Sequence, residues 1–99
     1  MEIEKIIQDV KTGKAIILDV REREEWDEGH IKGAMHYSLG RIQRGEIPAI
    51  PKDILIYTHC RAGVRGAEAA EALMNAGFTQ VVCLGGYEDW KSVGGNVIE

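Results

Sequence analysis

The sequence lacks any long run of hydrophobic residues. No stretch approaches the roughly 18 apolar residues that a membrane-spanning helix needs, and the first ten residues, MEIEKIIQDV, are acidic and amphipathic, unlike a secretory signal. Neither a membrane span nor a signal sequence is therefore predicted. We expect a protein of the reducing cytoplasm that has no membrane partner.

The chain is also poor in cysteine. It contains two, Cys60 and Cys83, with no CxxC pair and no histidines and cysteines at the spacing of metal ligands. These absences exclude a disulfide framework and a zinc site, and no metal or other cofactor is expected. The sequence by itself leaves a single Cys60–Cys83 bridge open.

Repeats and low-complexity segments are absent as well. A length of 99 residues, 44% of them hydrophobic, suits one domain over residues 1–99 with one core. The formal net charge of −4 argues against nucleic acid as a partner. Charge is unevenly placed, because residues 22–28 carry five acids and one base, whereas residues 32–65 carry six bases and two acids. We expect a monomer or a weak dimer.

Helical and extended patterns alternate along the chain. Ile3, Ile6, Ile7 and Val10 have the spacing of one helix face, and Gly13 follows as a stop. Further helices are predicted at residues 23–27, 39–44 and 87–91, together with an alanine-rich helix that ends at Gly77. Buried strands are predicted at residues 15–19, 54–57 and 80–84, and a brief strand at residues 34–37.

Strands that are apolar along their whole length are typical of a parallel sheet with helices on both faces. The predicted fold class is therefore α/β, an open three-layer sandwich around a mainly parallel sheet. Ligands in such folds bind outside the carboxyl ends of the strands. Residues 19–21, 60–65 and 85–86 each follow or end a predicted strand, so we expect them to meet at one rim, with Gly85-Gly86 turning the chain.

The segment CRAGVR, residues 60–65, joins a predicted strand to the alanine-rich helix. A free cysteine has a pKa of about 8.5 and is mostly a thiol at pH 7. Backbone N–H groups and the positive end of a helix dipole favour the thiolate and bind oxyanions. The position of Cys60 therefore predicts a nucleophile.

Three motifs in this order resemble those of rhodanese-like domains: DVREREEWDEGHIKGAMHYSL over residues 19–39, CRAGVR, and LGGYEDW over residues 84–90. The resemblance spans nearly the whole chain. It implies a single-domain sulfurtransferase with a five-stranded sheet, in which Cys60 takes sulfane sulfur as a persulfide. The implied donor is a small molecule such as thiosulfate or polysulfide, and the implied acceptor is cyanide or a thiol, or a protein.

The resemblance also assigns roles within the segment. Cys60 and Arg65 are the implied catalytic residues, and the implied substrate-binding residues are Arg61, Ala62, Gly63 and Val64. The two arginines add positive charge for an anionic donor. Gly63 suits a position where φ is positive or where a side chain would crowd the loop.

Two alternatives accompany this interpretation. One is a sulfur carrier or interaction module that protein partners load and unload. The other is a phosphatase or arsenate reductase of related fold, whose loop has five residues between cysteine and arginine; here Gly66 stands where that arginine would be. His59, directly before Cys60, resembles the phosphatases, but a neighbour on a strand points to the opposite face.

Residues around this segment are expected to be structural. Asp19 and Arg21 are predicted to pair and to satisfy backbone groups at the rim, and His30 is also expected to be structural. Cys83 lies within a predicted buried strand and is expected to be inert core. Trp26 and Trp90 are expected to serve in packing.

Overall fold

The computed structural model describes residues 2–99, and its centre is a parallel sheet of four strands. These are β1 (Ala15–Asp19), β3 (Met35–His36), β4 (Leu55–Cys60) and β5 (Gln80–Gly86), in the spatial order β3-β1-β4-β5. Two short strands that the sequence patterns did not predict, β2 (His30–Ile31) and β6 (Val97–Ile98), form a separate antiparallel pair. The central sheet thus has four strands where the resemblance implied five.

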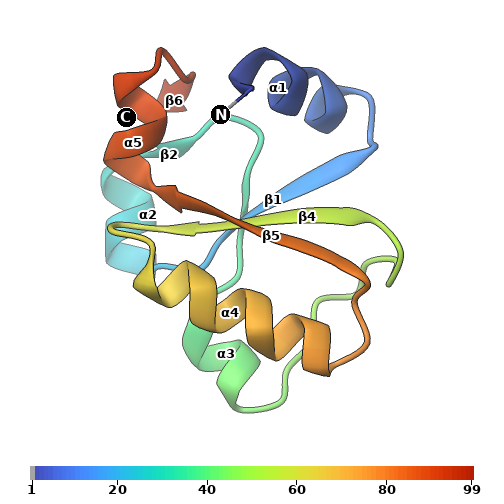
Figure 1. The fold of residues 1–99 in the computed structure, drawn as a ribbon. Coiled ribbons are helices and arrows are strands. Elements are labelled where there is room, and N and C mark those ends of the chain that lie inside the picture. Colours follow the sequence, from blue (N-terminus) through green and yellow to red (C-terminus); the bar gives the residue numbers. More distant parts are fainter. Residues whose placement is uncertain (1) are drawn as a thin grey trace.

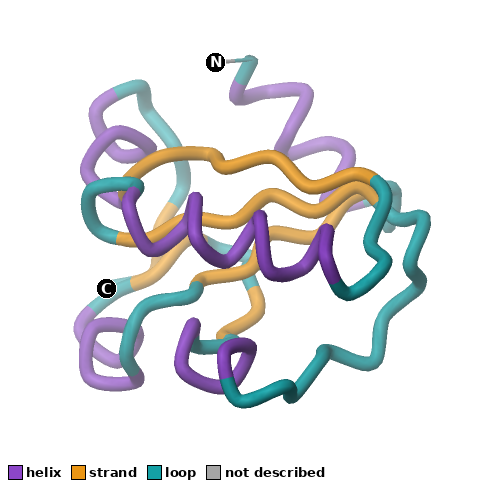
Figure 2. Tube along the Cα trace, turned by 60° about the horizontal axis from the view of Figure 1, so that its bottom comes forward, coloured by secondary structure: helices purple, strands orange, loops and turns teal. Residues whose placement is uncertain are grey.

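Helices cover both faces of this sheet, as Figures 1 and 2 show. Within residues 2–99 the helices are α1 (Ile3–Lys11), α2 (Arg23–Glu28), α3 (Leu39–Gln43), α4 (Val64–Asn75) and α5 (Tyr87–Ser92). Helices α3 and α4 lie on one face, and α1 and α5 lie on the other. The predicted open α/β sandwich is confirmed. Among residues 2–99, no helix has both the length and the apolar composition that crossing a lipid bilayer requires.

Alternation along the strands divides the core into two layers. In β1, Leu18 packs with the α3 and α4 layer, whereas its neighbour Ile17 packs with the α1 and α5 layer. The first layer is completed by Ile56, Leu73 and Phe78, and Trp90 anchors the second; these side chains are at most 2% exposed. Burial of apolar area at roughly 25 cal/mol per Å² makes these layers the main source of stability.

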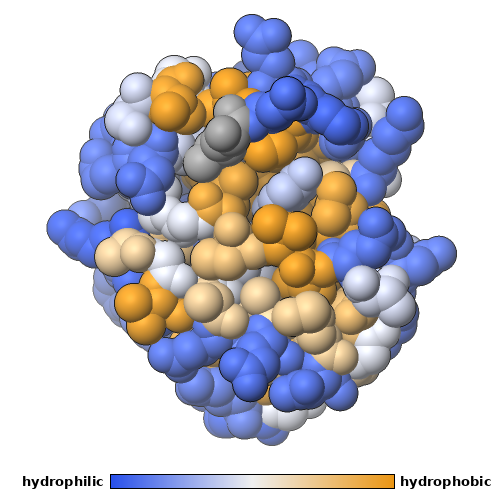
Figure 3. All heavy atoms as spheres, in the orientation of Figure 1, coloured by the Kyte–Doolittle hydropathy of each residue, from blue (hydrophilic) through white to orange (hydrophobic). Residues whose placement is uncertain are grey.

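Strand β5 departs from the prediction, because it is an edge strand and not a buried one. Val82 is 47% exposed and Cys83 is exposed, so the expectation that Cys83 is inert core was wrong. Figure 3 shows apolar atoms at the surface over β5, between α1 and α4. An apolar β-branched run has the same sequence pattern at an edge as in the middle of a sheet, so the pattern did not reveal the position.

The end of β5 brings the chain against residues 60–65, which we call the cysteine loop. Gly85-Gly86 was predicted to turn the chain; the two residues end strand β5, and Gly86 is also the N-cap of α5, so the strand passes directly into the helix at this pair. The register shifts by one residue here, since Thr58 pairs with Cys83 and His59 pairs with Gly85. Gly85 has a φ of 106°, a left-handed conformation that favours glycine.

A glycine is required at position 86 by the close approach of the loop. A Cβ built there collides with the carbonyl group of Arg61. We therefore expect Gly86→Ala to lower the free energy of unfolding by about 1–3 kcal/mol, because the loop backbone must move. Urea denaturation measures the change. Gly40→Ala is the matched control in α3, where the nearest atom is the Arg44 Nη1 at 3.5 Å, and it should be neutral or slightly stabilising. Equal stability of the two variants would contradict the predicted clash.

Candidate functional site

Cys60 ends strand β4, and its sulfur faces the first turn of α4. The side chain is 1% exposed, and the Gly63 N–H donates a hydrogen bond to Cys60 Sγ over 2.9 Å. Gly63 has a φ of 99° and is the residue that caps the start of α4, so the loop needs glycine at this point. The backbone thus directs an N–H group, and the positive end of a twelve-residue helix, toward the sulfur.

The other loop residues surround this sulfur from outside. Arg61 and Ala62 are exposed, and Val64, the first residue of α4, is 67% exposed. Three of the four predicted substrate-binding residues, Arg61, Ala62 and Val64, therefore form the outer surface of the loop, whereas Gly63 contacts the sulfur. A hydrogen bond of 2.7 Å from the Thr58 hydroxyl to the Gly66 carbonyl ties the helix start to strand β4.

Cys83 touches the outer side of the same loop. Its thiol donates a hydrogen bond of 3.6 Å to the Gly63 carbonyl, and its sulfur would lie 3.1 Å from a Cβ at Gly66. Both cysteines are free thiols. The bridge that the sequence left open is therefore not formed.

Arg65 lies in the first turn of α4 and points toward α2. Its two Nη atoms donate hydrogen bonds to the two carboxylate oxygens of Glu25, over 2.6 and 3.0 Å. These bonds lower the pKa of Glu25 from 4.5 to about 2, against the effect of burial, and they raise the pKa of Arg65. Arg65 thus connects the cysteine loop to α2, and the carboxylate of Glu25 neutralises most of its positive charge.

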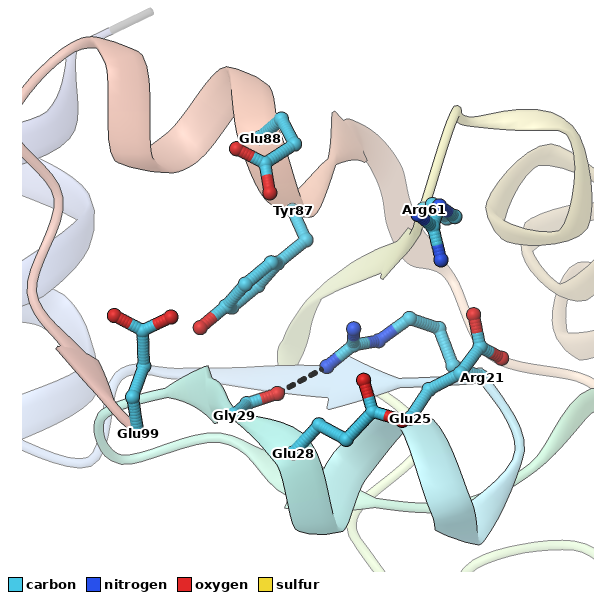
Figure 4. A pocket seen from close by; sticks show the side chains of 8 residues that line it. All are labelled: Arg21, Glu25, Glu28, Gly29, Arg61, Tyr87, Glu88 and Glu99. Carbon is cyan, nitrogen blue, oxygen red and sulfur yellow. Dashed lines mark hydrogen bonds between the residues drawn. The ribbon is translucent and has the colours of Figure 1, made fainter.

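A second, buried ion pair supports the neighbouring strand end. Arg21 donates from Nη2 to Asp19 Oδ2 over 2.7 Å and from Nε to Oδ1 over 2.9 Å. The same Nη2 donates to the Gly29 carbonyl over 2.7 Å, which Figure 4 shows. His30, expected to be structural, stacks on Trp26 with ring centroids 3.6 Å apart, and its Nδ1 lies 3.0 Å from the Trp26 carbonyl. These contacts order the chain beside the loop.

His59 lies on the opposite face of β4 from Cys60. Its ring is 0% exposed and packs near Tyr87, and neither ring nitrogen has a hydrogen-bond partner among residues 2–99. Asp19 Oδ2 is 3.5 Å from Nε2. Burial lowers the pKa of His59 despite the opposing effect of Asp19, so the imidazole is neutral at pH 7. A side chain on this face does not reach the Cys60 sulfur.

The three predicted rim segments do meet. Asp19 pairs with His59 across β1 and β4, and Cys60 pairs with Gly86 across β4 and β5. Sequence reasoning missed Glu25, which stands 40 residues before its partner Arg65. The acidic run at residues 22–28, to which Glu25 belongs, was the available signal, because the loop arginines require a counter-charge. The spacing of residues in the sequence does not show which of its five acids pairs with Arg65.

Comparison with known proteins gives the family. Residues 2–93 match the profile of the rhodanese-like domain. The chain belongs to the rhodanese-like family. The thiosulfate sulfurtransferase GlpE of Coxiella burnetii is 35% identical over 85 residues, which span 84% of this chain and 78% of that protein.

A solved structure and a further relative support the assignment. The rhodanese-like domain of the Anabaena protein Alr3790 is 33% identical and superimposes with a TM-score of 0.78, covering 85% of this chain and 98% of that one. A putative sulfur carrier protein of Bacillus subtilis, YrkF, is 33% identical over 92 residues, which span 91% of this rhodanese-like chain and 49% of that protein.

The Arg65–Glu25 pair predicts a pH-dependent stability. Because the pKa of Glu25 is about 2 in the folded protein and near 4.5 without the pair, its contribution is fully present above about pH 4.5 and disappears as the pH falls toward 2. Glu25→Gln should therefore be about 1 kcal/mol less stable than the wild type at pH 7. The difference should vanish near pH 2.

Urea unfolding at several pH values tests this prediction. Glu71→Gln, in the exposed part of α4, is the control and should follow the wild type throughout. A stability difference for Glu25→Gln that persisted unchanged to the lowest pH would show that the loss comes from packing and not from the ion pair.

Proposed function

We propose that this rhodanese-like chain transfers sulfane sulfur through a persulfide on Cys60. The observation that carries the proposal is the Gly63 N–H on the Cys60 sulfur at the start of α4. That arrangement places a backbone N–H donor on the nucleophilic sulfur and beside the position of an added sulfur atom. Small sulfane compounds, thiosulfate or a polysulfide, are the proposed donors.

With thiosulfate, the first step is a displacement at sulfur. The Cys60 thiolate attacks the outer sulfur, a new S–S bond forms, and the bond between the outer sulfur and the sulfonate breaks. Sulfite leaves with the electron pair, and Cys60 carries a persulfide. The total charge of the reactants, one thiolate and a dianion, equals that of the persulfide anion and sulfite.

The second step returns Cys60 to its starting state. Cyanide or a thiolate attacks the outer sulfur of the persulfide, the S–S bond to Cys60 breaks, and thiocyanate or a new persulfide leaves. The exposed guanidinium of Arg61 can attract an anionic donor to the mouth of the loop. Arg65 holds the loop in place through Glu25.

A second candidate function is a sulfur carrier that protein partners load and unload. The likeness to YrkF, itself a putative sulfur carrier, favours it, and so does the burial of Cys60, which restricts access for reagents in solution. The chain would act as a monomer or a weak dimer in either case, and neither function uses a metal or another cofactor.

If the reaction passes through a persulfide on Cys60, turnover should depend on Cys60 and not on Cys83. Wild type supplied with thiosulfate and cyanide should form thiocyanate, and Cys60→Ser should reduce kcat at least about a thousandfold, because the nucleophile is gone. Cys83→Ser is the matched control and should keep most of the activity. Failure of the wild type with thiosulfate and polysulfide alike, or full activity of Cys60→Ser, would disprove the sulfurtransferase proposal.

Mass spectrometry of the intact protein separates the enzyme from the carrier. A stable gain of one sulfur on Cys60 with negligible turnover of small donors favours the carrier, whereas rapid turnover favours the enzyme. Hydrolysis of an aryl phosphate that disappeared in Cys60→Ser would instead establish the phosphatase alternative.

A further inference from the structure

Strand β5 is an open edge of the central sheet. Within residues 2–99, β4 is the only strand that pairs with it, and no backbone hydrogen bond from a loop or a turn reaches residues 81–84. Figure 1 shows β5 in front of β4, and Figure 3, in the same orientation, shows apolar atoms on this side of the molecule. A strand paired on one side only directs the N–H and C=O groups of alternate residues away from the sheet, where another strand can pair with them.

This edge lacks the common protections against such pairing. Proteins shield edge strands by keeping them short or by placing charged residues or proline on them. Strand β3, at the other edge, has two residues, whereas β5 has seven, and none of the seven is charged or a proline. The register shift with β4 comes only after Cys83, so the first half of β5 is a regular, uncharged edge.

An apolar groove of about 420 Å³ runs along this edge, between β5 and the start of α1. Val82 is 47% exposed and is the most exposed large hydrophobic residue of the central sheet. It pairs with Tyr57 of β4, so its side chain lies on the face that α1 covers, together with that of Leu84. Ile6 of α1 also lines the groove. Pairing with a further strand would bury this apolar surface, which water now contacts.

The groove and the edge carry little charge. Glu2 and Lys5 are the charged residues that line the groove, and Lys5 pairs with Asp9 of the same helix over 2.9 Å. The formal net charge of −4 opposes the association of two copies of the chain. This face adds only one unmatched charge to that repulsion, the carboxylate of Glu2, so it is a suitable contact between identical molecules.

We propose that β5 pairs with β5 of a second copy of this chain, in antiparallel orientation and centred on Val82. A two-fold axis through this pair places Val82 opposite Val82 of the second copy. Val81 then stands opposite Cys83, and Gln80 opposite Leu84. Residues directly opposite each other lie on the same face of a sheet, so the two apolar grooves meet. The two four-stranded sheets become one sheet of eight strands, and this dimer does not depend on the function proposed above.

Sedimentation equilibrium tests the dimer. The mass of the wild type should rise toward twice that of the monomer as its concentration approaches about 1 mM. Val82→Lys should raise the dissociation constant at least about tenfold, because two ammonium groups would face each other at the axis. Met35→Lys is the matched control on the other edge strand, where Met35 is 43% exposed, and it should leave the constant unchanged. A monomeric wild type would leave β5 to a different partner and overturn the proposal, as would equal effects of the two variants.

A mixing experiment tests the register. Val82→Glu should be monomeric like Val82→Lys, because two carboxylates would meet at the axis. An equimolar mixture of the two variants should associate, since one carboxylate then faces one ammonium group. The mass of the mixture is compared with that of each variant at the same total concentration, and thermal unfolding of each variant verifies its fold. A mixture that stayed monomeric would show that Val82 does not face its own copy.

Disulfide trapping measures the same contact without adding charge. In a Cys60→Ser, Cys83→Ser background, Val82→Cys should form an interchain disulfide under mild oxidation at least about tenfold faster than Met35→Cys. Opposed Cβ atoms in an antiparallel pair are roughly 4.5–5.5 Å apart, close to the roughly 3.5–4.5 Å of a disulfide. Equal rates for the two variants would show random collision of exposed thiols and would contradict the proposed pairing.

Discussion

The register of three parallel strands is the constraint on which the site depends. Asp19 stands opposite His59, and Cys60 stands opposite Gly86, so the carboxyl ends of β1, β4 and β5 meet at one rim. Since side chains alternate along a strand, a slip of one residue would exchange the faces of His59 and Cys60. The imidazole would then occupy the start of α4, and the thiol would face Tyr87. The buried apolar layers on both faces hold the register, so the packing of the core and the position of the nucleophile cannot be separated.

Two ion pairs hold the segments that follow β1 and the cysteine, which the hydrogen bonds of the sheet do not position. The Asp19–Arg21 pair is buried, and its guanidinium also satisfies the Gly29 carbonyl, so the chain after β1 is held against the sheet without an unpaired charge. Arg65 and Glu25 connect the helix after the cysteine with the helix after β1. The loop is supported on its two sides by different means, hydrogen bonds from Thr58 and Cys83 on one and an ion pair on the other.

Short sequence patterns predicted the features that depend on neighbouring residues in the chain. The 3.6-residue spacing of Ile3, Ile6 and Ile7 gave α1, and the loop between β4 and α4 was evident from CRAGVR. Strand β5 was predicted as an element, but its exposure depends on its place in the sheet order, which is a property of the whole fold. The pair β2 and β6 has two residues in each strand and joins segments more than 60 residues apart, so neither has a pattern of its own. Glu25 was missed for the same reason, since its partner Arg65 is close only in space.

The Cys60 sulfur is supported by backbone groups and not by the charged side chains of its loop. The sulfur needs donors of hydrogen bonds and positive potential, which the Gly63 N–H and the start of α4 supply through backbone groups. Backbone dipoles act over a few ångströms, so they stabilise the sulfur without making the neighbouring surface cationic. If the loop instead relied on arginine charge, Arg65 would have to face the sulfur, but it faces Glu25, which leaves Arg61 as the one unpaired loop cation in residues 2–99. The loop arginines are thus left to other contacts, Arg65 to the ion pair that joins α4 to α2 and Arg61 to the exposed surface, while backbone groups alone support the sulfur.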